Sequence, residues 1–179
     1  MGKSFKKLKY FFALFLFPSF AFAALPLSIS GKLGFNYGSM LENTGISPWS
    51  YFWGGEVAYN YKKLVYFGLF YDRTSISLDG GRSASMQMIG PTLRLRGSSN
   101  IVESNLFGEF QLGLAALNEQ EYSTRNSIGY SFGASYELPL SDVVSLRGSL
   151  HYRRINTVIN GLDRIFHFFE PSLLMMVYI

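Results

Sequence analysis

Three residues supply the kinds of side chain that a hydrolase uses. Ser149 and His151 stand two positions apart, so they share one face of a β-strand, and Glu137 has the same parity on the preceding alternating segment. A serine, a histidine and a carboxylate can provide a nucleophile, a general base and the group that orients the base. The competing interpretation is that His151 belongs to a buried polar network beside Arg153 and a carboxylate. The elements that position these residues decide between the two.

The rest of the sequence offers little further chemistry. The chain has no Cys and two His, which excludes disulfides, thiolate chemistry and a Cys-based zinc site. Neither a nucleotide-binding glycine loop nor an HExxH or GxSxG motif occurs. Asp79-Gly80-Gly81 is typical of a turn, with too few acidic ligands for calcium, and His167 has an equally plain structural interpretation. We expect no metal and no cofactor.

The first 23 residues are typical of a secretory signal peptide. Four lysines precede an apolar run from Tyr10 to Phe17, and Ala21-Phe22-Ala23 matches a small-x-small cleavage site. The apolar run is shorter than the roughly 20 residues that span a bilayer as a helix, which disfavours a membrane anchor. The predicted organisation is therefore a signal peptide over 1–23 and one domain over 24–179.

Removal of the signal peptide changes the charge of the protein. Four of the 16 Lys and Arg lie within it, so the predicted mature chain balances 12 basic against 12 acidic residues. A neutral chain without a basic patch gives no indication of nucleic-acid binding.

Strict alternation of apolar and polar residues runs through most of residues 24–179. This period of two predicts β-strands, and segments of about ten residues separated by turn-forming clusters are typical of transmembrane barrels. Eight such segments are predicted: Leu27 to Gly38, Tyr51 to Tyr61, Leu64 to Arg73, Ser85 to Arg96, Ser104 to Ala116, Ile128 to Leu138, Val143 to Arg153 and Phe166 to Ile179. In the fourth, Met86 and Met88 fall on the polar parity, which predicts a bulge near Gly90-Pro91.

The connections between these segments alternate between long and short. Long polar connections are predicted at 39–50, 74–84, 117–127 and 154–165, and short ones lie between them. Long loops at one end and short turns at the other are the plan of an up-and-down transmembrane barrel. The fold predicted is therefore all-β: an eight-stranded antiparallel barrel.

Charge parity indicates which face of the strands is the interior. Five bases and five acids share the parity of the small residues: Lys32, Arg94, Arg96, Arg147, Arg153, Glu56, Asp72, Glu109, Glu137 and Glu170. A basic side chain facing lipid near the midplane would cost about 2–4 kcal/mol, so we expect these ten residues to form an ion-pair network in the lumen. Eight strands leave room only for side chains, and Tyr66, Phe70 and Phe107 share this parity, which predicts a closed lumen rather than a channel.

The opposite parity predicts the lipid-facing surface. Its aromatic residues fall near the ends of the segments, as the interfacial girdles of a membrane barrel require; they are Tyr37, Tyr51, Trp53, Tyr61, Tyr71, Tyr130 and Tyr152. A soluble lipocalin-like barrel would turn this face inward around a ligand. It would also need an outer surface richer in charge than the Gly, Ser, Ala and Asn found here.

The signal peptide, the eight segments, GEFQLGLAAL in the fifth and EPSLLMMVYI at the end resemble the small OmpA/OmpX-type outer-membrane barrels. The resemblance covers the whole predicted mature chain. It implies a Gram-negative-type outer membrane with its lipopolysaccharide, and insertion by the barrel-assembly machinery. It also implies a C-terminal assembly signal, here Leu173, Met175, Val177 and Ile179, which ends in Ile where the family has an aromatic residue. No peptidoglycan-binding domain follows, so no tether to the cell wall is implied.

The resemblance also allows an enzymatic alternative. Some eight-stranded barrels modify lipid A, and their deacylases place a His-x-Ser pair on the lipid side. Here the order is Ser149-Leu150-His151 with inward parity, which favours the structural interpretation. We therefore expect a structural or interaction protein that exposes four loops, with a rim-site lipid A hydrolase as the alternative and a soluble periplasmic barrel as the third. Loop residues such as Glu119, Glu121 and Arg125 identify no ligand.

Overall fold

The structure, a computed structural model, describes residues 26–40, 49–61, 64–77, 83–98, 103–118, 127–159 and 162–179. The predicted signal peptide and the Asp79-Gly80-Gly81 turn lie outside these residues. The described part consists of eight β-strands: β1 Leu27–Met40, β2 Trp49–Tyr61, β3 Val65–Ser77, β4 Ser83–Ser98, β5 Glu103–Asn118, β6 Ser127–Pro139, β7 Val144–Ile159 and β8 Leu162–Tyr178. Among the described residues, no helix is long and apolar enough to cross a bilayer.

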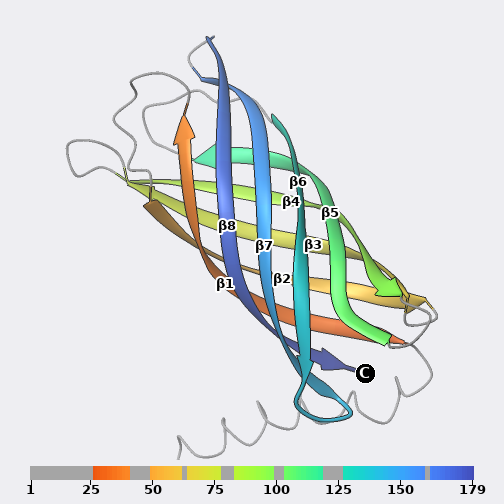
Figure 1. The fold of residues 1–179 in the computed structure, drawn as a ribbon. Helices are drawn as coiled ribbons and strands as arrows, with labels where there is room; N and C mark the ends of the chain where they lie inside the picture. Colours follow the sequence, from red (N-terminus) through yellow and green to blue (C-terminus); the bar gives the residue numbers. More distant parts are fainter. Residues whose placement is uncertain are drawn as a thin grey trace, which may run out of the picture.

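Each strand pairs with the next in antiparallel orientation, and β8 returns to pair with β1. The closing seam joins Ile29 to Val177 and Leu33 to Leu173. Figure 1 shows the resulting tilted barrel, with the C-terminus at the end where β6 turns into β7. The predicted eight-stranded antiparallel up-and-down barrel is confirmed.

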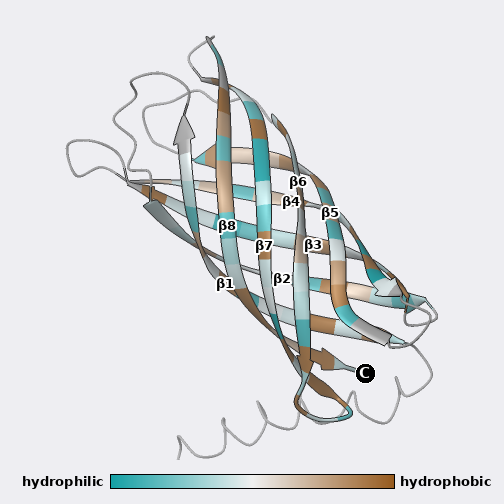
Figure 2. Cartoon of the chain, in the orientation of Figure 1, coloured by the Kyte–Doolittle hydropathy of each residue, from teal (hydrophilic) through white to brown (hydrophobic). Residues whose placement is uncertain are grey.

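The two faces of the strands differ sharply in polarity. Outward-facing apolar side chains remain exposed, for example Leu33 at 68% and Leu69 at 64%, whereas the inward-facing Arg94 is 0% exposed. Along each strand the two kinds of residue alternate (Figure 2). The apolar face therefore lies outside, the reverse of the arrangement that a lipocalin-like barrel requires.

The strands extend further toward the long-loop end than the alternation predicts. The predicted loop over 154–165 is wrong, because β7 continues to Ile159 and β8 begins at Leu162, with Thr157 paired to Arg164 and Val158 to Asp163. The other three long connections are also shorter than predicted, since β1, β3 and β5 run on to Met40, Ser77 and Asn118. Polar residues end the apolar belt, but backbone pairing continues beyond it.

The predicted bulge near Gly90-Pro91 is also wrong. The register of β4 with β5 is the same before this dipeptide, at Ile89 with Leu114, and after it, at Thr92 with Gln111. Proline has no N–H to donate, so the ladder is interrupted there without a shift. The irregularity on β4 lies instead between Arg96 and Ser98.

Met86 and Met88 point into the barrel and are 4% and 1% exposed. They belong to an apolar cluster in the loop-end half of the lumen, which also includes Phe70, Ile76, Ala115, Ile155, Phe166 and Phe168. A second small cluster of Ala58, Tyr66 and Phe107 lies at the turn end. Most of the buried charged residues lie in the lumen between these two apolar clusters.

Candidate functional site

The buried charges are brought together by strand parity and by glycines on neighbouring strands. Gly54 pairs with Asp72, and a Cβ at Gly54 would collide with Asp72 Oδ1 and the carbonyl oxygen of Tyr71. Gly133 pairs with His151, and a Cβ there would collide with the imidazole ring. The small residues on the inner wall therefore provide the space in which the large charged side chains cross the lumen.

One group of charges, the Glu56–Glu109 cluster, lies in the turn-end half and comprises Glu56, Arg94, Arg147, Glu109 and His151. Arg94 Nη2 lies 2.6 Å from Glu56 Oε1, and Arg147 lies 3.8 Å from Glu56 and 3.5 Å from Glu109. Glu109 also bonds to His151 Nε2 at 2.8 Å and accepts a hydrogen bond from Ser135 Oγ. Side chains from β2, β4, β5 and β7 thus meet inside the lumen.

The second group, the Asp72 cluster, lies closer to the loops and comprises Lys32, Asp72, Arg153 and Glu170. Asp72 accepts a hydrogen bond from Lys32 Nζ at 3.2 Å and another from Arg153. Arg153 Nε lies 3.1 Å from Glu170 Oε2, and its Nη2 donates to Gln111 Oε1 at 3.3 Å. This cluster links β1, β3, β5, β7 and β8.

Because these side chains are buried, each positive charge needs a negative charge close to it. The side chains of Arg147, Arg153 and Glu170 are at most 1% exposed. Removing one partner of such a pair leaves a buried uncompensated charge, at a cost of about 3–5 kcal/mol. The arrangement suits side chains that brace opposite walls of the barrel against one another.

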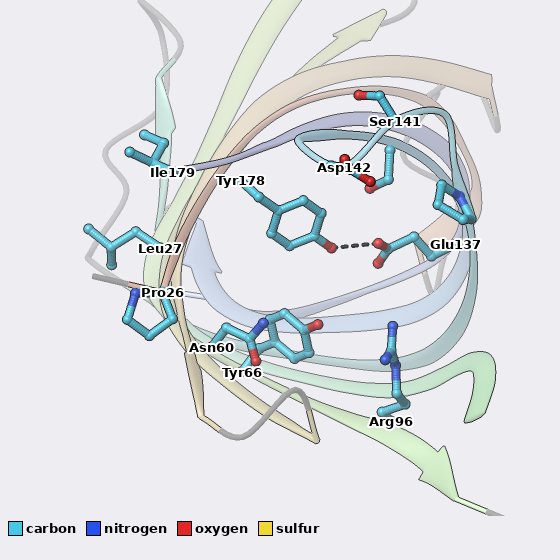
Figure 3. A pocket seen from close by; sticks show the side chains of 12 residues that line it. Pro26, Leu27, Asn60, Tyr66, Arg96, Glu137, Ser141, Asp142, Tyr178 and Ile179 are labelled. Carbon is cyan, nitrogen blue, oxygen red and sulfur yellow. Dashed lines mark hydrogen bonds between the residues drawn. The ribbon is translucent and has the colours of Figure 1, made fainter. Parts of the chain in front are cut away.

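A cavity of about 430 Å³ opens at the turn end of the lumen. Figure 3 shows Tyr178 pointing into it, with its hydroxyl donating to Glu137 Oε1 at 2.5 Å. Arg96 also lines it, its guanidinium 5.1 Å from the centre of the Phe107 ring. Arg96 and Glu137, which share the inward parity, therefore lie at the mouth rather than in either cluster.

The three candidate catalytic residues make hydrogen bonds to three different partners. His151 bonds to Glu109, Glu137 to Tyr178, and Ser149 to Ser172 at 2.5 Å. His151 is 1% exposed inside the lumen. A nucleophile and its base need mutual hydrogen-bond geometry and access to substrate. Within the described ranges, no group of three or more His, Asp or Glu residues is placed to hold a metal ion.

The seven aromatic residues predicted for the girdles all face outward. Tyr37, Tyr51, Trp53 and Tyr61 are 46–62% exposed, and Tyr71, Tyr130 and Tyr152 are partly exposed. The wall holds further aromatic residues that the prediction omitted, among them Trp49, Tyr59 and Tyr136. Trp49 lies against Tyr37, with ring centres 4.8 Å apart. All share the parity of the predicted seven, so the pattern could have identified them.

The last strand closes the barrel with its apolar residues outward. Leu173, Met175 and Val177 are 54%, 57% and 40% exposed, and Ile179 is partly exposed. The aromatic residue of this segment, Tyr178, points the other way, into the mouth of the lumen. The apolar residues of the segment are thus placed on the outer wall, while its aromatic side chain is held inside.

A closed antiparallel barrel of eight strands, apolar outside and charged inside, is the architecture of the small transmembrane β-barrels of outer membranes. Two solved structures of this class are similar to the chain. Neisserial surface protein A (NspA) matches with a TM-score of 0.62 and 15% identity, over 86% of this chain and 97% of that one. The outer membrane protein OprG from Pseudomonas aeruginosa matches with a TM-score of 0.54 and 12% identity, over 87% and 94%. At these identities the likeness establishes the fold.

No protein-family model matches the sequence, and the search of curated proteins found no match. The fold therefore stands as that of a small outer-membrane-type barrel, without assignment to the OmpA/OmpX type in particular.

Proposed function

We propose that this protein is an integral outer-membrane barrel of structural or interaction type. In this proposal a signal peptide directs export, the barrel-assembly machinery inserts the chain, and the long connections face the cell exterior. The apolar outer wall contacts lipid and lipopolysaccharide, and the loops are the surface available to an extracellular partner. The barrel would be an OmpA/OmpX-type one in its size and strand number.

The observation that carries the proposal is the opposite polarity of the two walls. Large apolar residues on all eight strands are exposed, including Phe67 at 53%, Leu114 at 60% and Leu150 at 57%. Soluble monomers rarely expose apolar patches beyond a few hundred Å², whereas lipid requires such a belt. Charges on the other wall form ion pairs in the lumen, among them Lys32 with Asp72 and Arg94 with Glu56.

A closed lumen is the second part of the proposal. The two charged clusters reach across the barrel, and Phe52, Tyr66 and Phe107, each at most 2% exposed, fill space beside them. Buried ion pairs leave no continuous water-filled path, in contrast to the wide lumen of a porin. Planar-bilayer recordings on the refolded chain should therefore show no stable conductance steps, and regular steps would overturn this part.

We also propose that His151 has a structural rather than a catalytic role. It bonds to Glu109 in a fully buried cluster, and Ser149 bonds to Ser172 instead. These contacts support the polar-network interpretation over a rim-site hydrolase.

Membrane integration has a direct test. The chain should fractionate with outer membranes and migrate faster on a detergent gel unheated than boiled, as folded barrels do. Spin labels should place Leu112 in lipid and Glu109 in an enclosed polar site. Recovery in the soluble periplasmic fraction, or a lipid contact at Glu109, would overturn the proposal.

A further inference from the structure

An arginine and a histidine break the apolar pattern of the outer wall on neighbouring strands. Arg154 of β7 and His167 of β8 both lie on the outward parity, and the two residues are directly paired across the strands. Both are partly exposed. On the other side of Arg154, β6 places Tyr130 as its cross-strand partner. A basic group on a lipid-facing wall requires an explanation, because near the midplane it would be costly.

The height of these residues on the barrel provides that explanation. The height is measured from Val144 and Val177, which are paired with each other at the turn end of the outer wall. Arg154 lies ten residues beyond Val144 on β7, and His167 lies ten residues before Val177 on β8. Ten strand residues at about 3.3 Å each, tilted by about 40°, rise about 25 Å. An outer-membrane belt is about 25 Å tall. Arg154 and His167 therefore lie where the acyl region ends and lipid headgroups begin, on the loop side.

His167 is held in place by aromatic contacts. Tyr152 Oη and His167 Nδ1 form a hydrogen bond, and the Tyr152 ring lies 5.3 Å from Phe132 and 5.5 Å from Phe169. With Tyr152 donating to Nδ1, the proton of the neutral imidazole is on Nε2, which can donate to an anion. The ring therefore presents a positioned donor rather than a mobile one.

Arg154 keeps most of its hydrogen-bonding capacity for a ligand. Among the described residues its guanidinium makes one hydrogen bond, from Nε to Asn156 Oδ1 at 3.2 Å. This contact orients the group and leaves the two terminal NH₂ groups as donors. A guanidinium fork suits the bidentate binding of phosphate.

We propose that Arg154 and His167, supported by Tyr152 and Asn156, form a binding site for the phosphate group of an outer-leaflet lipid headgroup. The ligand class is a phosphorylated glycolipid such as lipid A. Its acyl chains would lie along the apolar wall of β6, β7 and β8, where Phe132, Leu150 and Phe169 are exposed. The inference rests on the proposed outer-membrane location and adds a defined lipid contact to it.

The chain contains a matched control on the far side of the barrel. Arg73 of β3 also faces outward in the loop-end half, but its cross-strand partners are Trp53 and Gln87. It therefore provides the same charge as Arg154 without a histidine beside it. A specific site predicts that Arg73 and Arg154 behave differently, whereas general attraction to anionic lipid predicts that they behave alike.

The experiment is a lipid titration of the refolded chain in detergent micelles, followed by native mass spectrometry. The probes are lipid A and the same lipid after removal of its phosphates. We expect the wild-type chain to retain lipid A about tenfold more strongly than the dephosphorylated lipid. Arg154→Gln and His167→Gln should each remove most of this preference, and Arg73→Gln should keep it.

Equal retention of the two lipids by the wild-type chain would overturn the inference, as would equal losses in Arg73→Gln and Arg154→Gln. Displacement of lipid A by millimolar inorganic phosphate would show a site for the free anion instead. Heat-modifiable migration of every variant checks the barrel separately. If the chain inserts into membranes but shows no preference for the phosphorylated lipid, only this site is contradicted. If the chain does not insert, the proposed function is contradicted.

Discussion

Arg94 Nη2 lies 2.6 Å from Glu56 Oε1, in an ion pair that joins strands β4 and β2 across the strand between them. Both side chains are buried, Arg94 completely. Arg147 of β7 approaches the same carboxylate from another wall, at 3.8 Å. Glu56 therefore ties three strands together by charge, independently of the backbone ladder, and this gives the lumen a direct role in stability.

Neutralising Glu56 should destabilise the barrel strongly. Glu56→Gln leaves the buried Arg94 guanidinium without its closest carboxylate, which should lower the free energy of unfolding by about 3–5 kcal/mol. Urea unfolding of the chain refolded in lipid vesicles measures this change. Pairing Glu56→Gln with Arg94→Met should recover part of the loss, because the uncompensated charge is then absent.

The control for this prediction is Asp142→Asn on the exposed turn between β6 and β7. Exposed charges contribute little, so this change should leave the unfolding midpoint almost unaffected. Equal midpoints for Glu56→Gln and Asp142→Asn would show that the lumen pair does not brace the barrel.

The alternation in the sequence was sufficient to predict the fold because each strand residue must face either the lumen or the lipid. A shift of one residue would move every charge of a strand onto the lipid face, so Arg94, Arg147 and Glu170 identify the inner wall by their type alone. The strand count and antiparallel order follow from the turn clusters between the alternating segments. These features are local, and a single sequence shows them.

The contacts inside the lumen could not be predicted in the same way. Parity places Glu109 and His151 inside, but the tilt and stagger of the strands determine that they meet. From the sequence, the carboxylate expected beside His151 was that of Glu137 instead. Met86 and Met88 were misread for a related reason. An apolar residue is typical of the outer wall, yet the loop-end part of this lumen is itself apolar.

A basic residue introduced in the middle of the outer wall should be costly. Phe110 on β5 is 46% exposed and lies about midway between the two ends of the apolar wall, so Phe110→Arg should lower the free energy of unfolding by about 2–4 kcal/mol in lipid vesicles. Leu106, nearer the turn end of the same strand and also outward, is the matched position. Leu106→Arg should cost about 0–1 kcal/mol. Similar costs at both positions would contradict a lipid belt centred on this part of the wall.

Replacing His151 should affect stability rather than lipid chemistry. His151→Ala removes one of the partners of the Glu109 carboxylate and should cost about 1–3 kcal/mol in unfolding free energy. Mass spectrometry of lipid A from cells that produce the wild-type chain or His151→Ala should give identical profiles, as should Ser149→Ala. A lipid A species that appears with the wild-type chain and disappears in both variants would instead establish the hydrolase.

The close approach of β6 and β7 at Gly133 provides a test of lumen packing. A Cβ at this position would collide with the carbonyl oxygen of Leu150 and with the His151 ring, so Gly133→Ala must displace either the backbone of β7 or the imidazole that bonds to Glu109. Overpacking of this kind costs about 1–3 kcal/mol, measurable by urea unfolding in vesicles. Gly148 is the control, because a Cβ there meets nothing within 4 Å and Gly148→Ala should be neutral or slightly stabilising. If the two alanine variants unfold at the same urea concentration, the inner wall at Gly133 is looser than the contacts of His151 require.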